Sequence, residues 1–351
     1  RCVVLAPLLV GFFALYLSAP VSATREKLVM TLESAGTGVE DREGVLLTTV
    51  SADRLPMLGE RLERALSSTE REDTRSLVVS SGREPGLRYF IHMRSLESII
   101  ARVRGEEIVR LLEEKRLVTY LHPIVDAANP QRAFAYECLT RGRDRDGAIV
   151  PPSFLFGLAR RADLLFYLDR ESRVTALKSG MGLSGHAKLF VNFNPATIYE
   201  PRHCLRTTMS TLEQAGLTPN DVVFEVVESD RVDDVEHLLH ILDFYRERGF
   251  KVALDDLGAG YNSLTTLQDL RPDYMKLDID LIRDVDRDPF REAIVRNLLA
   301  LAKELGILTI AEGIEREGEH LWLRNAGADY LQGYYFAHPR PAEEVIAEVV
   351  S

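Results

Sequence analysis

Residues 222–260 read VVFEVVESDRVDDVEHLLHILDFYRERGFKVALDDLGAG, and this stretch decides the fold. It holds two short, apolar, β-branched segments, 222–227 and 251–255, of the kind found in strands buried on both faces. The segment between them, 235–246, has apolar residues on one face of a helix, and Gly249 follows as a stop. The pattern predicts two parallel strands joined by a helical crossover.

The same alternation of strand and helix runs through residues 117–334. The predicted strands are 117–125, 133–139, 188–192, 222–227, 251–255, 274–277, 308–311 and 330–334. Eight such strands in a stretch of this length indicate an α/β fold of the (β/α)8 TIM-like barrel type. Only residues 126–132 join the first two strands, which is too short for a crossover, so the first strand should be antiparallel.

The chain before the barrel looks like a small α/β region, residues 24–110, of unknown role. Its predicted strands are 45–50, 76–80 and 88–93, and its predicted helix is 54–67. The polar stretch 67–73 is interpreted as a solvated loop. A charged helix, about 96–114, leads into the barrel domain, which is assigned to residues 111–351.

Residues 1–23 are apolar, and three interpretations of them stay open. An almost uninterrupted apolar run covers residues 3–17, and Val21, Ser22 and Ala23 resemble a secretory cleavage site. The same stretch is about long enough for a membrane anchor, which would tether a cytoplasmic catalytic domain to the inner membrane. The third interpretation is an upstream extension, with the true start at Met30.

Composition narrows the class of protein. The 351 residues include 43 Lys and Arg against 54 Asp and Glu, a net charge of −11, which argues against binding a nucleic-acid duplex by neutralising phosphates. The three cysteines are too few and too scattered for a disulfide framework or a zinc site. The composition indicates a soluble enzyme or binding protein.

Almost every predicted barrel strand has a polar residue near its carboxyl end or just after it. These residues are Glu137, Asn192, Glu225, Glu228, Asp255, Asp256, Lys276, Glu312 and Gln332. Barrel enzymes place their chemistry at this rim. Six carboxylates gathered there would repel one another unless cations lie among them, and all-oxygen ligands suit Mg²⁺ or Mn²⁺. Two such ions are the usual apparatus of phosphoryl hydrolysis.

Lys276 stands among these carboxylates in an otherwise apolar strand. Its ammonium group would be charged there and would orient a water or a phosphate oxygen. The alternative is an ordinary ion pair with Asp273 or Asp278, which the apolar strand makes less favourable.

Seven ordered motifs resemble one family. They are YECLTR (136–141) preceded by PIV (123–125), VNFN (191–194), FEVVES (224–229), DDLGAGYNSL (255–264), MKLD (275–278), AEGIE (311–315) and LQGYYF (331–336). Together they resemble EAL domains, the phosphodiesterases of the bacterial second messenger cyclic di-GMP. The resemblance covers residues 111–351 and says nothing about residues 1–110. It implies hydrolysis of one phosphodiester bond of cyclic di-GMP, which gives the linear dinucleotide.

The resemblance also implies roles for individual residues. One divalent cation would be held by Glu137, Asn192, Glu225 and Asp255, and a second by Asp255, Asp256 and Glu312. Lys276, Glu312 and Glu137 would be catalytic, and the substrate would contact Arg141, Gln332, Pro123 and Leu139. Glu228 would brace the loop 257–264, which in relatives reaches a dimer partner, so a homodimer near Asn262 is expected.

Two departures from the family pattern stand out. His122 replaces the usual Gln before Pro-Ile, which puts that ligand contact in doubt. Cys138 replaces the middle Ala and should point to the opposite face of its strand from Glu137, where it would serve packing. Neither change removes a charged group, so an active enzyme is favoured over two rivals: a cyclic di-GMP receptor that does not cut, and a metal-dependent barrel hydrolase with another substrate.

Overall fold

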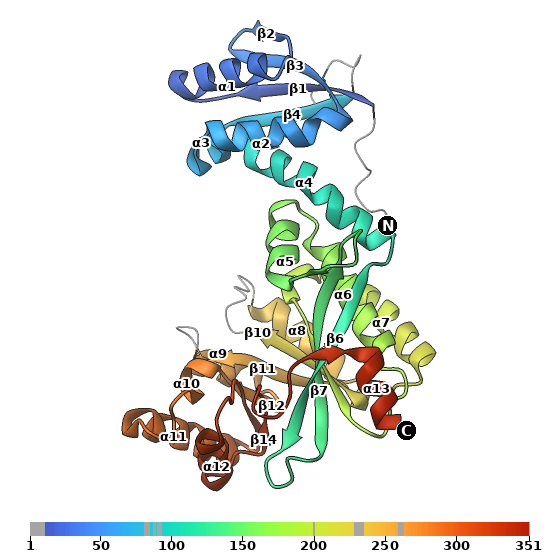
Figure 1. Ribbon diagram of the computed structural model, residues 1–351, viewed down its shortest axis with the longest axis vertical. Coiled ribbons are helices and arrows are strands. Elements are labelled where there is room, and N and C mark those ends of the chain that lie inside the picture. The colour runs from blue at the N-terminus through green and yellow to red at the C-terminus, as the bar shows by residue number, and fades with distance from the viewer. Residues whose placement is uncertain are drawn as a thin grey trace. The chain divides into compact units, whose positions relative to one another are not determined.

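The computed structural model describes residues 11–80, 85–86, 89, 93–198, 201–227, 235–258 and 263–350. The chain forms two compact units (Figure 1). The N-terminal unit comprises residues 1–116 and 150–168, and the barrel unit comprises residues 117–149 and 169–351. The expected border at residues 110 and 111 therefore lies inside the helix 96–113 that ends the first part of the N-terminal unit.

The N-terminal unit has an antiparallel sheet in the order β2-β3-β1-β4-β5. Its strands are β1 (Phe12–Ser18), β2 (Val39–Arg42), β3 (Val45–Ser51), β4 (Arg75–Ser80) and β5 (Arg94–Ser95). Its helices are α1 (Ser22–Ser34), α2 (Leu55–Ala65), α3 (Ser68–Asp73) and α4 (Leu96–Glu113). Leu15 and Leu17 of β1 pack against Leu28, Leu32 and Leu62 of the helices, because alternate residues of a strand share a face.

Two expectations for this unit need correction, and a third is largely untested. Residues 12–18 are not part of a separate apolar segment: β1 lies between β3 and β4, so burial in the sheet explains why the stretch is apolar. Residues 68–73 are helical rather than a loop, because Ser67 and Glu70 form a capping box that starts α3. Most of the predicted strand 88–93 lies outside the described residues, as do residues 1–10.

Membrane spanning was one interpretation of the N-terminal stretch. Within the described ranges, no helix combines the length and the apolar character that crossing a bilayer requires.

The barrel unit confirms the predicted (β/α)8 TIM-like fold. Its sheet has the order β15-β6-β14-β13-β12-β11-β10-β9-β7-β8, and β6 also pairs with β7, which closes the barrel. The strands are β6 (Leu117–Asp126), β7 (Ala133–Arg143), β8 (Ile149–Val150), β9 (Lys188–Asn192), β10 (Val222–Val227), β11 (Lys251–Leu257), β12 (Tyr274–Leu277), β13 (Leu308–Ala311), β14 (Tyr330–Leu331) and β15 (Arg340–Pro341). As predicted, β6 is antiparallel to its neighbours β7 and β14.

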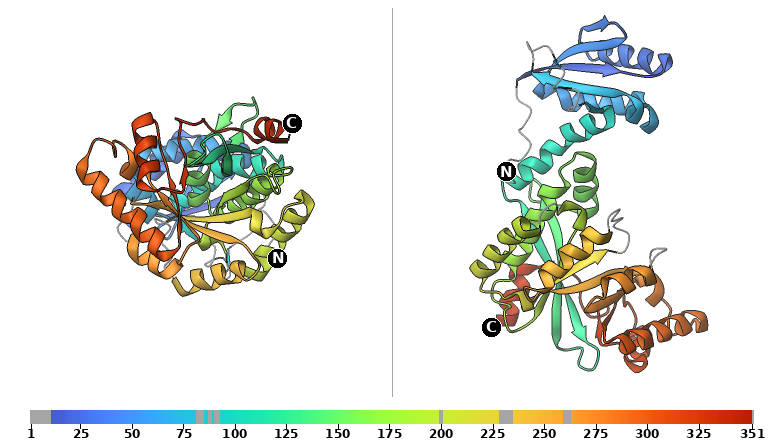
Figure 2. Two further views of the ribbon diagram at one scale, coloured as in Figure 1. Left: turned by 90° about the horizontal axis from the view of Figure 1, so that it is seen from below. Right: turned by 180° about the vertical axis from the view of Figure 1, so that it is seen from behind.

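Helices follow most of the barrel strands and surround them (Figure 2, left). They are α6 (Leu165–Ser179), α7 (Pro201–Ala215), α8 (Val235–Arg246), α9 (Ser263–Leu270), α10 (Ile279–Ile282), α11 (Pro289–Leu305), α12 (Glu317–Ala326) and α13 (Ala342–Val350). Helix α5 (Pro152–Arg161) belongs to the N-terminal unit. Gly306 ends α11 in the left-handed conformation that favours glycine.

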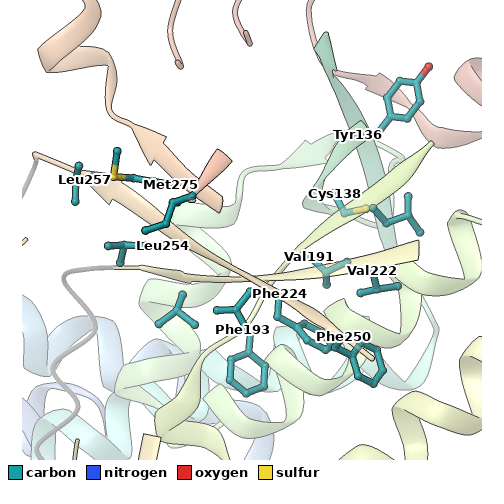
Figure 3. Packing of buried hydrophobic residues seen from close by; sticks show 14 of the residues in the cluster. Tyr136, Cys138, Val191, Phe193, Val222, Phe224, Phe250, Leu254, Leu257 and Met275 are labelled. Atoms are coloured by element: carbon teal, nitrogen blue, oxygen red, sulfur yellow. The ribbon is translucent and has the colours of Figure 1, made fainter. Parts of the chain in front are cut away.

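The barrel has an outer and an inner hydrophobic core. Outward-facing strand residues pack in a large outer cluster, with Phe193, Phe224 and Phe250 among its aromatic members (Figure 3). Cys138 lies in this outer cluster and is buried, which confirms its predicted packing role. The inner core comprises Ile124, Ala135, Phe190, Val223, Ala253, Tyr274 and Ile310. This inner layer forms the floor on which the polar residues sit.

Candidate active site

The polar rim is built by the two-residue period of the strands. The parallel strands β7 and β9 to β13 each have one inner-core residue. The residue two positions later in the sequence also faces inward, and in every case it is polar. The pairs are Ala135 and Glu137, Phe190 and Asn192, Val223 and Glu225, Ala253 and Asp255, Tyr274 and Lys276, and Ile310 and Glu312. Because side chains two apart lie on the same face of a strand, one end of the barrel is polar. The antiparallel β6 contributes His122, two residues before Ile124.

Lys276 lies at the centre of this rim, with its side chain 1% exposed. Its Nζ is 2.6 Å from Glu225 Oε1, 2.6 Å from Glu312 Oε1, 2.8 Å from Asp255 Oδ1 and 3.7 Å from Glu137 Oε1. These carboxylates, rather than Asp273 or Asp278, are its partners. The structure therefore brings together residues that are 175 positions apart in the chain, from 137 to 312.

Burial and crowding shift the pKa values of this cluster. Burial raises the pKa of Glu225 well above its usual range and that of Glu312 to about 8, against the opposing effect of Lys276. Burial also opposes ionisation of Glu137, but Lys276 and a hydrogen bond from Gln332 outweigh it and lower the pKa. Burial alone would lower the pKa of the Lys276 ammonium group, but the negative charges of the surrounding carboxylates outweigh it and raise that pKa. The cluster has more acidic groups than one ammonium group can neutralise.

Asp256 joins Asp255 on the same side of β11 because the strand is irregular there. The register between β11 and β12 shifts between Leu254 and Leu257, and Asp256 has a φ of 57°. In a regular strand the two neighbouring side chains would point to opposite faces. Instead, carboxylate oxygens of Asp255, Asp256 and Glu312 lie within 4.8 Å of one another. Burial and the charge of Asp255 raise the pKa of Asp256 to about 6.

Amide side chains complete the rim. Gln332 Nε2 donates to Glu137 Oε2 at 2.7 Å and lies 2.9 Å from His122 Nδ1. Asn192 Nδ2 donates to Glu225 Oε2 at 3.3 Å. The sequence-based site had no role for His122, because its partners become visible only when strands β6 and β7 and the segment after β14 meet.

The donor set fits divalent cations. Gln332 Oε1 is buried and has no hydrogen-bond partner among the described residues. Glu225 Oε1 and Glu312 Oε1 are also buried, and the Lys276 ammonium, 2.6 Å from each, has to serve both of them as well as Asp255. Buried oxygens in this state are costly without a further partner. Carboxylate and amide oxygens are the ligands that Mg²⁺ and Mn²⁺ prefer.

The remaining expected residues lie in different places. Leu139 and Arg141 share the face of β7 that carries Glu137, and β7 continues past Glu137 rather than ending close to it. Pro123 pairs with Tyr136, whose side chain lies in the outer core, so Pro123 is on the opposite face from the site. Glu228 and Asn262 lie outside the described residues.

A second acidic cluster lies beside the segment that follows Glu312. Arg316 Nη2 donates to Asp284 Oδ1, Asp286 Oδ1 and Glu319 Oε1 at 2.9, 2.7 and 2.8 Å. Glu319 also accepts from the backbone N–H groups of Asp284, Glu315 and Arg316 at 3.0 to 3.1 Å. Arg316 thus pairs with all three carboxylates of this cluster, and the network fixes the chain just after β13.

Replacing Glu319 with glutamine should lower the free energy of unfolding at pH 7 by about 1–3 kcal/mol, because Arg316 and several backbone donors lose a charged acceptor. Burial opposes ionisation of Glu319, but the hydrogen bonds from Asp284 and Glu315 and the charge of Arg316 lower its pKa below 4.5. Its contribution is therefore present above pH 4.5 and is lost as the pH falls through the folded-state pKa. The difference between wild type and variant should shrink accordingly.

Urea denaturation followed by fluorescence of Trp322, the only tryptophan, measures this effect because Trp322 lies on α12 beside Glu319. Glu317→Gln is the matched control: Glu317 is exposed, so its replacement should change the stability by less than about 0.5 kcal/mol. Equal effects of the two variants would contradict the role of the network.

Comparison with known proteins gives one family. The EAL domain model matches residues 106–339. MucR of Pseudomonas aeruginosa, described as a bifunctional diguanylate cyclase/cyclic di-GMP phosphodiesterase, is 29% identical over 249 residues, which cover 69% of this chain and 36% of MucR. The aligned segments of MucR and two further curated relatives cover 28% to 36% of those proteins, so this chain spans about a third of their length.

Solved structures agree with this match. The PaMucR phosphodiesterase in complex with c-di-GMP is 26% identical, with a TM-score of 0.61, and the match covers 68% of this chain and 98% of that one. A standalone EAL protein from Vibrio cholerae O395 in its c-di-GMP-bound form is 34% identical, with a TM-score of 0.58 and coverage of 64% and 93%. By its sequence match, its barrel and the order of its motifs, this chain belongs to the EAL domain family.

Proposed function

We propose that this protein is a metal-dependent phosphodiesterase that hydrolyses one phosphodiester bond of cyclic di-GMP, yields linear pGpG and so lowers the level of the second messenger. One observation carries the proposal: five carboxylates, those of Glu137, Glu225, Asp255, Asp256 and Glu312, meet at one end of the barrel around Lys276. A receptor that only binds the ligand would not need so many buried acidic groups.

Two divalent cations, Mg²⁺ or Mn²⁺, fit this set of donors. Glu137, Asn192, Glu225 and Asp255 would hold one, and Asp255, Asp256 and Glu312 the other. Bound cations of this kind activate a water for attack and stabilise charge on the leaving oxygen.

The residues of the chain prepare the site for that reaction. Lys276 keeps four carboxylates close together, and its positive charge would orient the attacking water or a phosphate oxygen. Gln332 holds Glu137 in place through its amide. Burial raises the pKa of Glu312 to about 8 in the metal-free chain, so this carboxyl group would release its proton when a cation binds.

The substrate class rests on the relatives, which bind or cut cyclic di-GMP. Arg141 supplies a cation for a substrate phosphate, and its guanidinium lies 5.7 Å from the centre of the Tyr120 ring. Leu139, on the same face, supplies apolar contact. Pro123 is left out because the register places it on the other face of β6.

The decisive experiment incubates the full chain with cyclic di-GMP and Mg²⁺ or Mn²⁺ and separates the products by chromatography. The expected product is pGpG, with no turnover after chelation of the metal. Binding without cleavage would support the receptor of the EAL fold instead. Neither binding nor cleavage would indicate a different phosphodiester substrate.

Two further properties follow from the family resemblance. We expect a homodimer formed through the barrel near Asn262, which lies outside the described residues, and a barrel that works in the cytoplasm, where this second messenger is used. Light scattering tests the first point: a monomer at working concentration would contradict it.

A further inference from the structure

His122 and Glu137 lie directly opposite each other in the antiparallel pair β6 and β7. Side chains opposed in this way share a face and are close enough to interact. Yet His122 Nδ1 is 4.0 Å from Glu137 Oε2, too far for a hydrogen bond. The amide nitrogen of Gln332 fills this gap, 2.9 Å from the first atom and 2.7 Å from the second.

The chemistry of these three groups fixes which atom donates. A carboxylate beside the Lys276 ammonium accepts hydrogen bonds, so the –NH₂ group of Gln332, rather than its oxygen, must face Glu137. The second hydrogen of that –NH₂ group then points at His122 Nδ1, which has to accept it. The ring proton is left on Nε2, which lies 3.1 Å from the carbonyl oxygen of Ala337 and donates to it.

We infer that His122, as the Nε2–H tautomer, is a positioning residue that orients the Gln332 amide and through it holds Glu137 at the rim. The ring also ties the chain segment from Gln332 to Ala337 to β6, because its two nitrogens contact both ends of that segment. Both amide hydrogens of Gln332 are thus used, and its buried Oε1, which has no partner among the described residues, remains an acceptor at the site.

This role assigns His122 a function that does not require contact with the substrate. For the proposed function, the consequence is that the Glu137 side chain is held in one orientation before a cation binds, because hydrogen bonds from other residues orient a metal ligand. Only this consequence rests on the proposed cation site. The hydrogen-bond assignment itself stands on the metal-free chain.

The tautomer is measured by ¹⁵N NMR of histidine-labelled full-length protein without metal or substrate. His122→Asn identifies the His122 signals by their disappearance. The expected pattern is that of a neutral ring with the proton on Nε2. A proton on Nδ1, or a doubly protonated ring, would overturn the inference, because Nδ1 would no longer accept from Gln332.

The positioning role is measured by calorimetric titration with Mn²⁺ alone. His122→Leu removes both hydrogen bonds and should weaken Mn²⁺ binding about tenfold, as loss of an outer partner of a metal ligand does. His122→Asn keeps an acceptor near the position of Nδ1 and should recover most of that loss. Unchanged affinity in His122→Leu, or no rescue by His122→Asn, would overturn the positioning role.

The matched control is His320→Leu. His320 is also buried in the barrel unit, but neither ring nitrogen has a hydrogen-bond partner among the described residues, and its ring lies against Tyr335 and Phe336. Its replacement should leave Mn²⁺ affinity unchanged. If the wild type binds no Mn²⁺, the proposed cation site fails, while the tautomer measurement still decides the hydrogen-bond assignment.

Discussion

Replacing Glu137 with alanine should reduce the turnover of cyclic di-GMP at least about 100-fold while the barrel stays folded. Loss of an outer partner of a metal ligand typically costs 10- to 100-fold, and Glu137 is proposed as a direct ligand. The fold should survive because the variant also removes one negative charge from a crowded cluster, which offsets the hydrogen bond lost by Gln332. Chromatographic assay of pGpG gives the rate, and thermal unfolding gives the stability.

The control for this variant is Glu236→Ala, which removes an exposed carboxylate from α8 in the same unit. It should keep the wild-type rate. A rate for Glu137→Ala within about twofold of wild type would contradict the assignment of Glu137 to a cation, whatever the variant's stability.

The barrel and its rim were predictable because both depend on short-range periodicity. Short apolar strands such as 222–227 and 251–255 are typical of a parallel sheet buried on both faces, and the polar residues Glu225 and Asp255 were expected at its rim without knowledge of the neighbouring strands. The short link 126–132 was enough to predict the antiparallel first strand. These features are local, and the structure confirms the fold that they predict.

Other features depended on contacts that the sequence does not display. The apolar residues 12–18 resemble a signal or an anchor until they are seen between β3 and β4. The position of Asp256 depends on an irregular strand and a positive φ. His122 acquires its hydrogen-bond partners from residues 210 and 215 positions away, so only the folded chain shows that it belongs to the site.

Replacing Lys276 with methionine should lower the free energy of unfolding of the metal-free protein by about 3–5 kcal/mol, the usual cost of breaking a buried ion pair by removing one partner. The four carboxylates around Nζ would remain buried without a positive charge, and Glu225 is fully buried. The raised pKa values of Glu225 and Glu312 should rise further and Glu137 should lose the pKa-lowering effect of Lys276, so the folded chain would bind more protons than the unfolded one. Stability should then fall as the pH rises above 4.5.

The pH dependence of stability distinguishes two effects of Lys276→Met, the loss of a positive charge and the loss of packing, because only the first changes with pH. In wild type the pKa of Asp256 is already raised to about 6 and that of Glu312 to about 8, so the metal-free protein should lose stability between pH 4.5 and 8, and the variant should lose more. Mg²⁺ should restore more stability to the variant than to wild type, because a divalent cation replaces the missing charge. Turnover should stay low, because the group that orients the water is gone.

Lys251→Met provides the matched control, because Lys251, the first residue of β11 in the same barrel, forms a half-exposed ion pair with Asp273. Its replacement should cost less than about 1 kcal/mol and should not respond to Mg²⁺. Urea denaturation followed by Trp322 fluorescence compares both variants across pH. If Lys276→Met lost the same stability at every pH and Mg²⁺ had no effect, the carboxylates would not depend on the charge of Lys276, and the electrostatic account of the rim would be wrong.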